Sequence, residues 1–83
     1  MRIRVKMLYF GQARDESGRA EEAFSLDAGS TIRTLAELAM KEHPALLRLR
    51  ATAKFALNEE IAGGSETLED GDVVALLPPV AGG

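Results

Sequence analysis

The strongest constraint on the fold is a two-residue alternation of side chains over residues 2–10. Successive side chains of a strand point to opposite faces. One face therefore carries Ile3, Val5, Met7 and Tyr9. The other carries charged residues first and apolar residues last: Arg2, Arg4, Lys6, Leu8 and Phe10. The pattern predicts a strand with one buried face, which requires neighbouring strands and a covering layer.

Later segments are predicted to complete the sheet. They cover residues 22–26, 54–58, 59–62 and 73–77. The short link after the first strand favours an antiparallel pair with residues 22–26, and residues 59–62 extend or pair with the strand before them. Turn residues at Gly63-Gly64 and at positions 69–72 separate the later segments.

A single amphipathic helix is predicted between the second and third strands. Its apolar residues recur at spacings of three and four: Ile32, Leu35, Ala36, Leu38 and Ala39. Ser30 or Thr31 caps the first free N–H groups, and Pro44 ends or kinks the helix. One helix over one face of a mixed sheet is an α+β domain.

The length of 83 residues fits one domain, predicted to span residues 1–83 with a flexible tail at residues 78–83. At this size the order of elements indicates a β-grasp, ubiquitin-like roll. The net charge of −3 argues against nucleic acid as a partner, because phosphate binding needs clustered basic side chains. Arg2, Arg4 and Lys6 are interpreted as a solvated strand face.

The absence of cysteine and of a long apolar run excludes several kinds of site. The chain has no cysteine, which excludes a disulfide, a thiolate metal ligand and a cysteine nucleophile. No apolar run is long enough to span a bilayer, and the alternating N-terminus is not a signal peptide. We therefore expect a cytoplasmic protein without a membrane partner.

Few residues offer a catalytic, metal or cofactor-binding site. His43 at the helix end is interpreted as facing solvent or the helix dipole. Glu59 and Glu60 are adjacent strand residues, so their carboxylates point to opposite faces. Asp70 and Asp72 lack the other ligands of a calcium loop. We expect no bound metal and no bound cofactor.

The C-terminal end is the main candidate site. Pro78 and Pro79 follow the last strand, stiffen the chain and direct it away from the sheet. Gly82 and Gly83 carry no Cβ and can pass through a narrow channel. The carboxylate of Gly83 needs activation, for example by adenylation, before it accepts sulfur as a thiocarboxylate or an amine as an amide.

A second candidate is an apolar surface beside the tail. If Val74 and Leu76 point inward, Leu77 points outward. Phe10, Ile61 and Leu77 are then predicted to form a partner-binding patch near the exit of the tail. The alternative is that these residues pack beneath a loop or a curl of the sheet.

The whole chain resembles the family of molybdopterin synthase small subunits. The most specific match is the C-terminal segment of residues 70–83, which ends Pro-Pro-Val-Ala-Gly-Gly. The segment from Val5 to Asp15, with Phe10-Gly11-Gln12-Ala13-Arg14, resembles the first strand and turn of that family. Asn58 occupies the position of an asparagine that is frequent in it.

The resemblance implies the β-grasp fold and a role as sulfur carrier in molybdenum cofactor biosynthesis. A ubiquitin-activating-like adenylyltransferase would adenylate Gly83 with ATP and Mg²⁺, and a sulfur-donating enzyme would convert it to a thiocarboxylate. The tail would enter the active site of the large synthase subunit, within a heterotetramer, and donate sulfur to a cyclic pyranopterin. The large subunit would supply the catalytic groups. The implied contact residues are Phe10, Ile61, Leu77, Pro78, Pro79, Val80 and Ala81.

Three alternatives stay open. A related sulfur carrier for thiamin or tRNA thiolation would use the same terminal chemistry with another acceptor. A protein modifier would form isopeptide bonds with lysines. A plain β-grasp interaction module would carry an inert tail.

Overall fold

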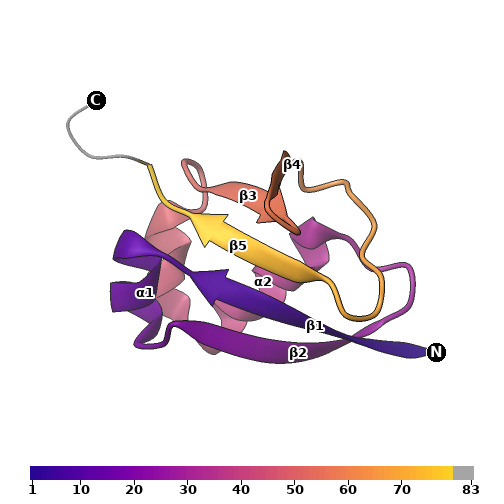
Figure 1. Ribbon diagram of the computed structural model, residues 1–83. Coiled ribbons are helices and arrows are strands. Elements are labelled where there is room, and N and C mark those ends of the chain that lie inside the picture. The colour runs from indigo at the N-terminus through magenta and orange to yellow at the C-terminus, as the bar shows by residue number, and fades with distance from the viewer. Residues whose placement is uncertain (80–83) are drawn as a thin grey trace.

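The computed structural model describes residues 1–79, and residues 80–83 lie outside the described part. Five strands form one sheet: β1 (Arg2–Tyr9), β2 (Glu21–Asp27), β3 (Lys54–Leu57), β4 (Glu60–Ala62) and β5 (Val73–Leu77). Three helical segments connect them: α1 (Gly11–Ser17), α2 (Ile32–Glu42) and the 3₁₀ helix η1 (Pro44–Leu49). Figure 1 shows this order along the chain.

The sheet is mixed and has the strand order β2-β1-β5-β3-β4. The first and last strands, β1 and β5, pair in parallel at its centre, and the other neighbours pair antiparallel. The predicted antiparallel pair of the first two strands is confirmed. Residues 60–62 pair with β3 as a separate strand, which decides between the two expectations for that segment.

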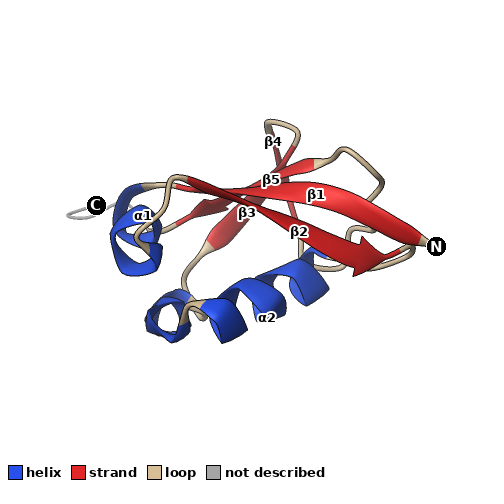
Figure 2. Cartoon of the chain, turned by 90° about the horizontal axis from the view of Figure 1, so that it is seen from below, coloured by secondary structure: helices blue, strands red, loops and turns tan. Residues whose placement is uncertain are grey.

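The helices cover only one face of the sheet. Figure 2 shows α2 beneath the strands and α1 at one end, while the opposite face carries no helix within residues 1–79. We call this opposite side the open face, and the side that packs on α2 the covered face.

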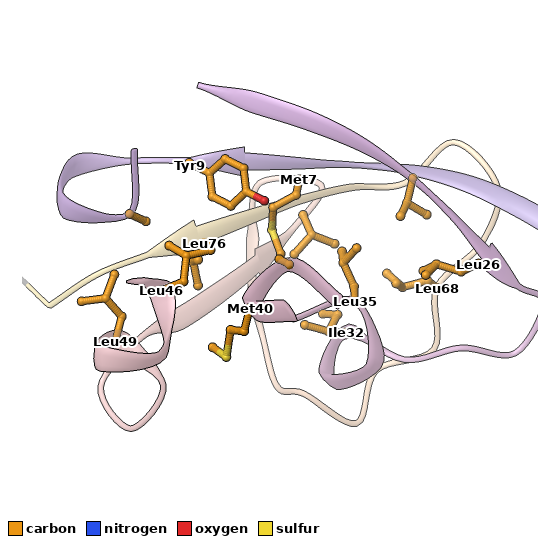
Figure 3. Close-up of a cluster of buried hydrophobic side chains, with 14 of the residues drawn as sticks. Met7, Tyr9, Leu26, Ile32, Leu35, Met40, Leu46, Leu49, Leu68 and Leu76 are labelled. Carbon is orange, nitrogen blue, oxygen red and sulfur yellow. The ribbon is translucent and has the colours of Figure 1, made fainter. Parts of the chain in front are cut away.

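The covered face holds the hydrophobic core (Figure 3). The alternate residues of β1 are almost fully buried: Ile3, Val5, Met7 and Tyr9. Val74 and Leu76 of β5 complete this layer, as predicted, and contribute to the same cluster as Ile32 and Leu35 of α2. Burial of apolar area at about 25 cal/mol per Å² is the main favourable contribution to folding.

The boundaries of α2 follow from its end residues. Thr31 is the N-cap, and its side chain accepts a hydrogen bond from the N–H of Thr34 at 3.3 Å. The helix ends at Glu42, and Pro44 begins η1, because proline is tolerated in a first helical turn but not in an interior. Leu38 of the predicted stripe is only half-buried, and Met40 is buried instead.

The β3–β4 hairpin differs from its prediction in one respect. Asn58 and Glu59 form a two-residue loop instead of strand, and both have positive φ, 49° and 74°. Two successive positive φ values fit a type I′ turn, whose twist matches that of the flanking strands. Asparagine tolerates this conformation, but for a side chain such as Glu59 it costs about 1 kcal/mol.

Polar side chains hold the start of β5. Asp70 Oδ1 accepts from the N–H of Arg4 at 2.8 Å, and Asp72 Oδ2 accepts from the N–H of Glu69 at 2.7 Å. The Asn58 amide donates to Asp72 Oδ1 at 3.0 Å and accepts from the N–H of Val73 at 2.9 Å. These residues therefore have a structural role in joining the hairpin to the centre of the sheet.

Candidate functional site

The open face carries an apolar row that crosses four strands. Leu8 of β1 is opposite Ala75 of β5, Ala75 is opposite Ala56 of β3, and Ala56 is opposite Ile61 of β4. Residues opposite each other in register share one face, with Cβ atoms about 4.5–5.5 Å apart. Ile61 at the edge of the sheet is 73% exposed, whereas its neighbour Ala56 is 7% exposed, so the row reaches solvent mainly at its Ile61 end.

Phe10 and Leu77 lie next to this row at the end of the sheet where β5 stops. Phe10 follows β1 directly, precedes α1 and is 47% exposed. Leu77 is half-buried and, two residues after Ala75 on the same strand, shares the open face with it. The outward direction predicted for Leu77 and the exposure predicted for Phe10 and Ile61 agree with the structure. Their role in binding a partner stays a prediction.

A depression of about 490 Å³ lies within the open face. It is lined by Leu8, Phe10, Ala56, Asn58, Glu59, Val73 and Ala75. Only Phe10 of the three predicted patch residues lines it, because Leu77 and Ile61 border the open face at its end and its edge. Leu8, which shares the parity of Phe10, was detectable from the sequence. Ala56 and Ala75 were not singled out, because they become neighbours only through strand pairing.

The base of the tail lies against α1. Gly11, the first residue of α1, has φ of 50°, and a Cβ built on it would lie 3.3 Å from Cγ of Pro78. Pro78 is half-buried and Pro79 exposed directly after β5. Figure 1 shows the end of β5 beside α1. The predicted site residues Val80, Ala81, Gly82 and Gly83 lie outside the described residues.

The basic residues of β1 lie on the open face as predicted, but two of them are paired. Arg2 Nη1 lies 2.8 Å from Asp27 Oδ1, and Lys6 Nζ lies 3.6 Å from Glu21 Oε2. These exposed pairs connect β1 to β2 and contribute between zero and about 1 kcal/mol each. Their charges are thereby largely compensated on that side of the open face.

A polar cluster on the covered side was missed by sequence reasoning. The Tyr9 hydroxyl donates to Glu22 Oε1 at 2.8 Å, and His43 Nε2 lies 2.8 Å from the same oxygen. An ionised carboxylate only accepts, so His43 Nε2 is the donor. The interpretation of His43 as a residue facing solvent is therefore wrong: its side chain is 18% exposed and joins the end of α2 to β2. His43 does lie at the C-cap of α2, where the helix dipole was expected to act on it.

The cluster perturbs two pKa values. Burial alone would raise the pKa of Glu22, but the hydrogen bonds from Tyr9 and His43 outweigh it and hold that pKa below its ordinary value of 4.5. Burial, with the Glu22 hydrogen bond, raises the pKa of Tyr9 above its ordinary value of 10. At neutral pH, Glu22 therefore stays ionised and Tyr9 stays protonated. The cluster is a structural connection between β1, β2 and the end of α2.

Across residues 1–79, no group of three or more His, Asp or Glu side chains is placed to hold a metal ion. None of the helices in the described part is long and apolar enough to cross a membrane.

Sequence comparisons agree with the resemblance seen in the motifs. The model of the ThiS family matches residues 7–83. A molybdopterin synthase sulfur carrier subunit from Chlamydomonas reinhardtii is 39% identical over 98% of this chain and 100% of its own length.

Solved structures share the fold. Molybdopterin converting factor subunit 1 from Pyrococcus furiosus aligns with a TM-score of 0.84 and 32% identity over 94% of this chain and 99% of its own. SAMP1 from Haloferax volcanii aligns with a TM-score of 0.88 and 25% identity, over 96% of this chain and 99% of its own. A third match is a chain in a complex of subunits 1 and 2 of the molybdopterin-converting factor from Helicobacter pylori. It aligns with a TM-score of 0.67 and 30% identity, over 98% of this chain and 100% of its own.

A ubiquitin from Caldiarchaeum subterraneum, with a TM-score of 0.66 and 17% identity over all of both chains, supports the fold alone. The predicted α+β β-grasp roll is therefore confirmed. The family match over residues 7–83, together with the relative at 39% identity, confirms the resemblance as well. The chain belongs to the ThiS family, and the curated proteins that it resembles include sulfur carrier subunits of molybdopterin synthase.

Proposed function

We propose that this chain is the sulfur carrier subunit of a molybdopterin synthase. The observation that carries the proposal is its full-length similarity to such a subunit, at 39% identity. The Helicobacter pylori complex of subunits 1 and 2 supports a large subunit as the partner. The described geometry is compatible with this role, because an open apolar face adjoins the strand that leads to Pro78 and Pro79.

The chemistry we propose takes place at Gly83. Its carboxylate oxygen attacks the α-phosphorus of ATP on an adenylating enzyme and displaces pyrophosphate, with Mg²⁺ compensating the phosphate charge. Hydrosulfide released by a sulfur-donating enzyme then attacks the acyl carbon and displaces AMP, and loss of the thiol proton leaves a thiocarboxylate. ATP and Mg²⁺ are therefore used by the activating enzyme and are not resident in this chain.

Each part of the chain has a distinct task in this proposal. Gly82 and Gly83 carry no side chain beyond the backbone, which permits entry into a narrow catalytic channel. Phe10, Ile61 and Leu77 supply apolar contact area to the large subunit, and Pro78, Pro79, Val80 and Ala81 bridge from that contact to the reactive end. The large subunit provides the groups that act on the cyclic pyranopterin.

Intact-mass measurement tests the proposed activation directly. The purified chain is incubated with an adenylating enzyme of the family, ATP, Mg²⁺ and a sulfur source. We expect a mass gain equal to the exchange of one oxygen for one sulfur. A chain that lacks Gly83 should gain nothing while keeping its melting temperature. No gain in the full chain would instead favour an interaction module with an inert tail.

The similarity to SAMP1, whose full name is small archaeal modifier protein 1, favours protein modification as a second candidate. In that case the activated Gly83 acyl group would be captured by a lysine amine and form an isopeptide bond. ATP-dependent conjugates between a tagged chain and other proteins would support it. Sulfur transfer to a thiamin or tRNA precursor, in place of the pyranopterin, would identify the other alternative acceptor.

A further inference from the structure

The β3–β4 loop contains a residue whose backbone conformation does not suit it. Glu59 has φ of 74° at the second position of a two-residue hairpin loop, where glycine is strongly preferred. The first loop residue, Asn58, both tolerates positive φ and is bonded to Asp72 and Val73. Glu59 has no such compensation, since its side chain makes no hydrogen bond or ion pair within residues 1–79.

The position of Glu59 places the backbone strain beside the open face. Glu59 lines the depression of the open face together with Leu8 and Phe10. The neighbouring carboxylate of Glu60 belongs to β4, where it is opposite Leu57 and alternates away from Ile61, so it belongs to the other face. Only one of the two adjacent carboxylates is therefore placed beside the depression.

The charges of the open face are unevenly compensated. On β1, Arg2 and Lys6 are paired with Asp27 and Glu21 of β2, and neither basic residue lines the depression. On the hairpin side, Glu59 is exposed and unpaired within the described chain. An isolated carboxylate at the border of an apolar surface attracts a cation on a partner and fixes how that partner docks.

We propose that Glu59 is a specificity-determining residue that pairs with a lysine or arginine of the large synthase subunit. Strained backbone conformations are retained where function requires the residue that causes them. Here a glycine would relax the loop but remove the carboxylate. The inference rests on the proposed function, because it concerns the partner of the same open face.

Binding of the large subunit to four versions of the chain tests the inference: wild type, Glu59→Gln, Glu59→Gly and Glu60→Gln. We expect Glu59→Gln and Glu59→Gly to weaken binding about three- to tenfold at low ionic strength, mainly through slower association. The loss should shrink at high salt. Glu60→Gln, the matched control, should leave the affinity unchanged.

Stability provides the second readout. Glu59→Gly should raise the melting temperature by roughly 2–4 °C, since it removes the positive-φ strain while it weakens binding. Opposite signs for stability and affinity in one variant are not expected from a merely structural residue. Weakening by Glu59→Gly but not by Glu59→Gln would overturn the charge pairing, as would equal losses in Glu59→Gln and Glu60→Gln.

The failure of this inference is distinguishable from failure of the proposed function. If wild type binds the large subunit and the Glu59 variants bind equally well, the role of Glu59 is disproved and the carrier function stands. If wild type itself does not bind, the proposed function fails, and the inference fails with it.

Discussion

The two faces of the sheet contrast most clearly within β5. Val74 and Leu76 point to the covered face and are 0% and 1% exposed, whereas Ala75 and Leu77 on the open face are only partly buried. The same short strand thus supplies both the core and the proposed partner surface. The contrast shows that apolar character on both faces of a strand does not by itself mean burial on both faces: the covering helix exists on one side only.

The largest effect should come from the covered face. Leu76→Ala removes a fully buried side chain from the core and should lower the free energy of unfolding by about 2–5 kcal/mol. The adjacent Leu77→Ala is the matched control on the open face, and we expect less than about 1.5 kcal/mol there. Chemical denaturation of both variants measures the difference; equal losses would abolish the distinction between the faces.

On the open face, a substitution should weaken partner binding more than it lowers stability. Phe10→Arg places a charge at a 47% exposed position, so folding should be little affected. Loss of an aromatic anchor from an interface typically costs about 2 kcal/mol or more in binding, or roughly thirtyfold in Kd. Titration with the large subunit and a thermal melt provide the two readouts. Unchanged affinity would remove Phe10 from the proposed contact.

The covered side should also respond to acid through Glu22. Its folded-state pKa lies below its ordinary value of 4.5, so its stabilising contribution is fully present above that pH. The contribution is lost as the pH falls through the lower folded-state value. We expect Glu22→Gln to be less stable than wild type at neutral pH and the gap to narrow in acid. A gap independent of pH would contradict the assigned role of the carboxylate.

Local patterns in the sequence were sufficient to predict most of the fold. Alternation in residues 2–10 correctly placed Met7 and Tyr9 in the core, and a capping residue and a proline placed the ends of α2. The β1–β5 and β3–β5 pairings at the centre of the sheet were not predicted, because no local pattern specifies which distant strands become neighbours. The positive φ of Glu59 was missed for a related reason: glutamate is not a residue that signals a tight hairpin loop.

The candidate site was predicted only in part. Exposure of Phe10 and Ile61 follows from parity, whereas the depression depends on Ala56 and Ala75, which lie 19 positions apart and meet only through β3–β5 pairing. The Tyr9–Glu22–His43 cluster likewise joins three elements distant in sequence. Contacts of this kind depend on tertiary structure and leave no periodic signal in the chain.

Reconstituted sulfur transfer tests the central claim most directly. The chain is first converted to its thiocarboxylate, then mixed with purified large subunit and cyclic pyranopterin, and dithiolene formation is followed. We expect product in proportion to the carrier consumed, none from a chain lacking Gly83, and a reduced rate from Phe10→Arg. A fully thiocarboxylated wild-type chain that binds the large subunit but delivers no sulfur to the pterin would contradict the account.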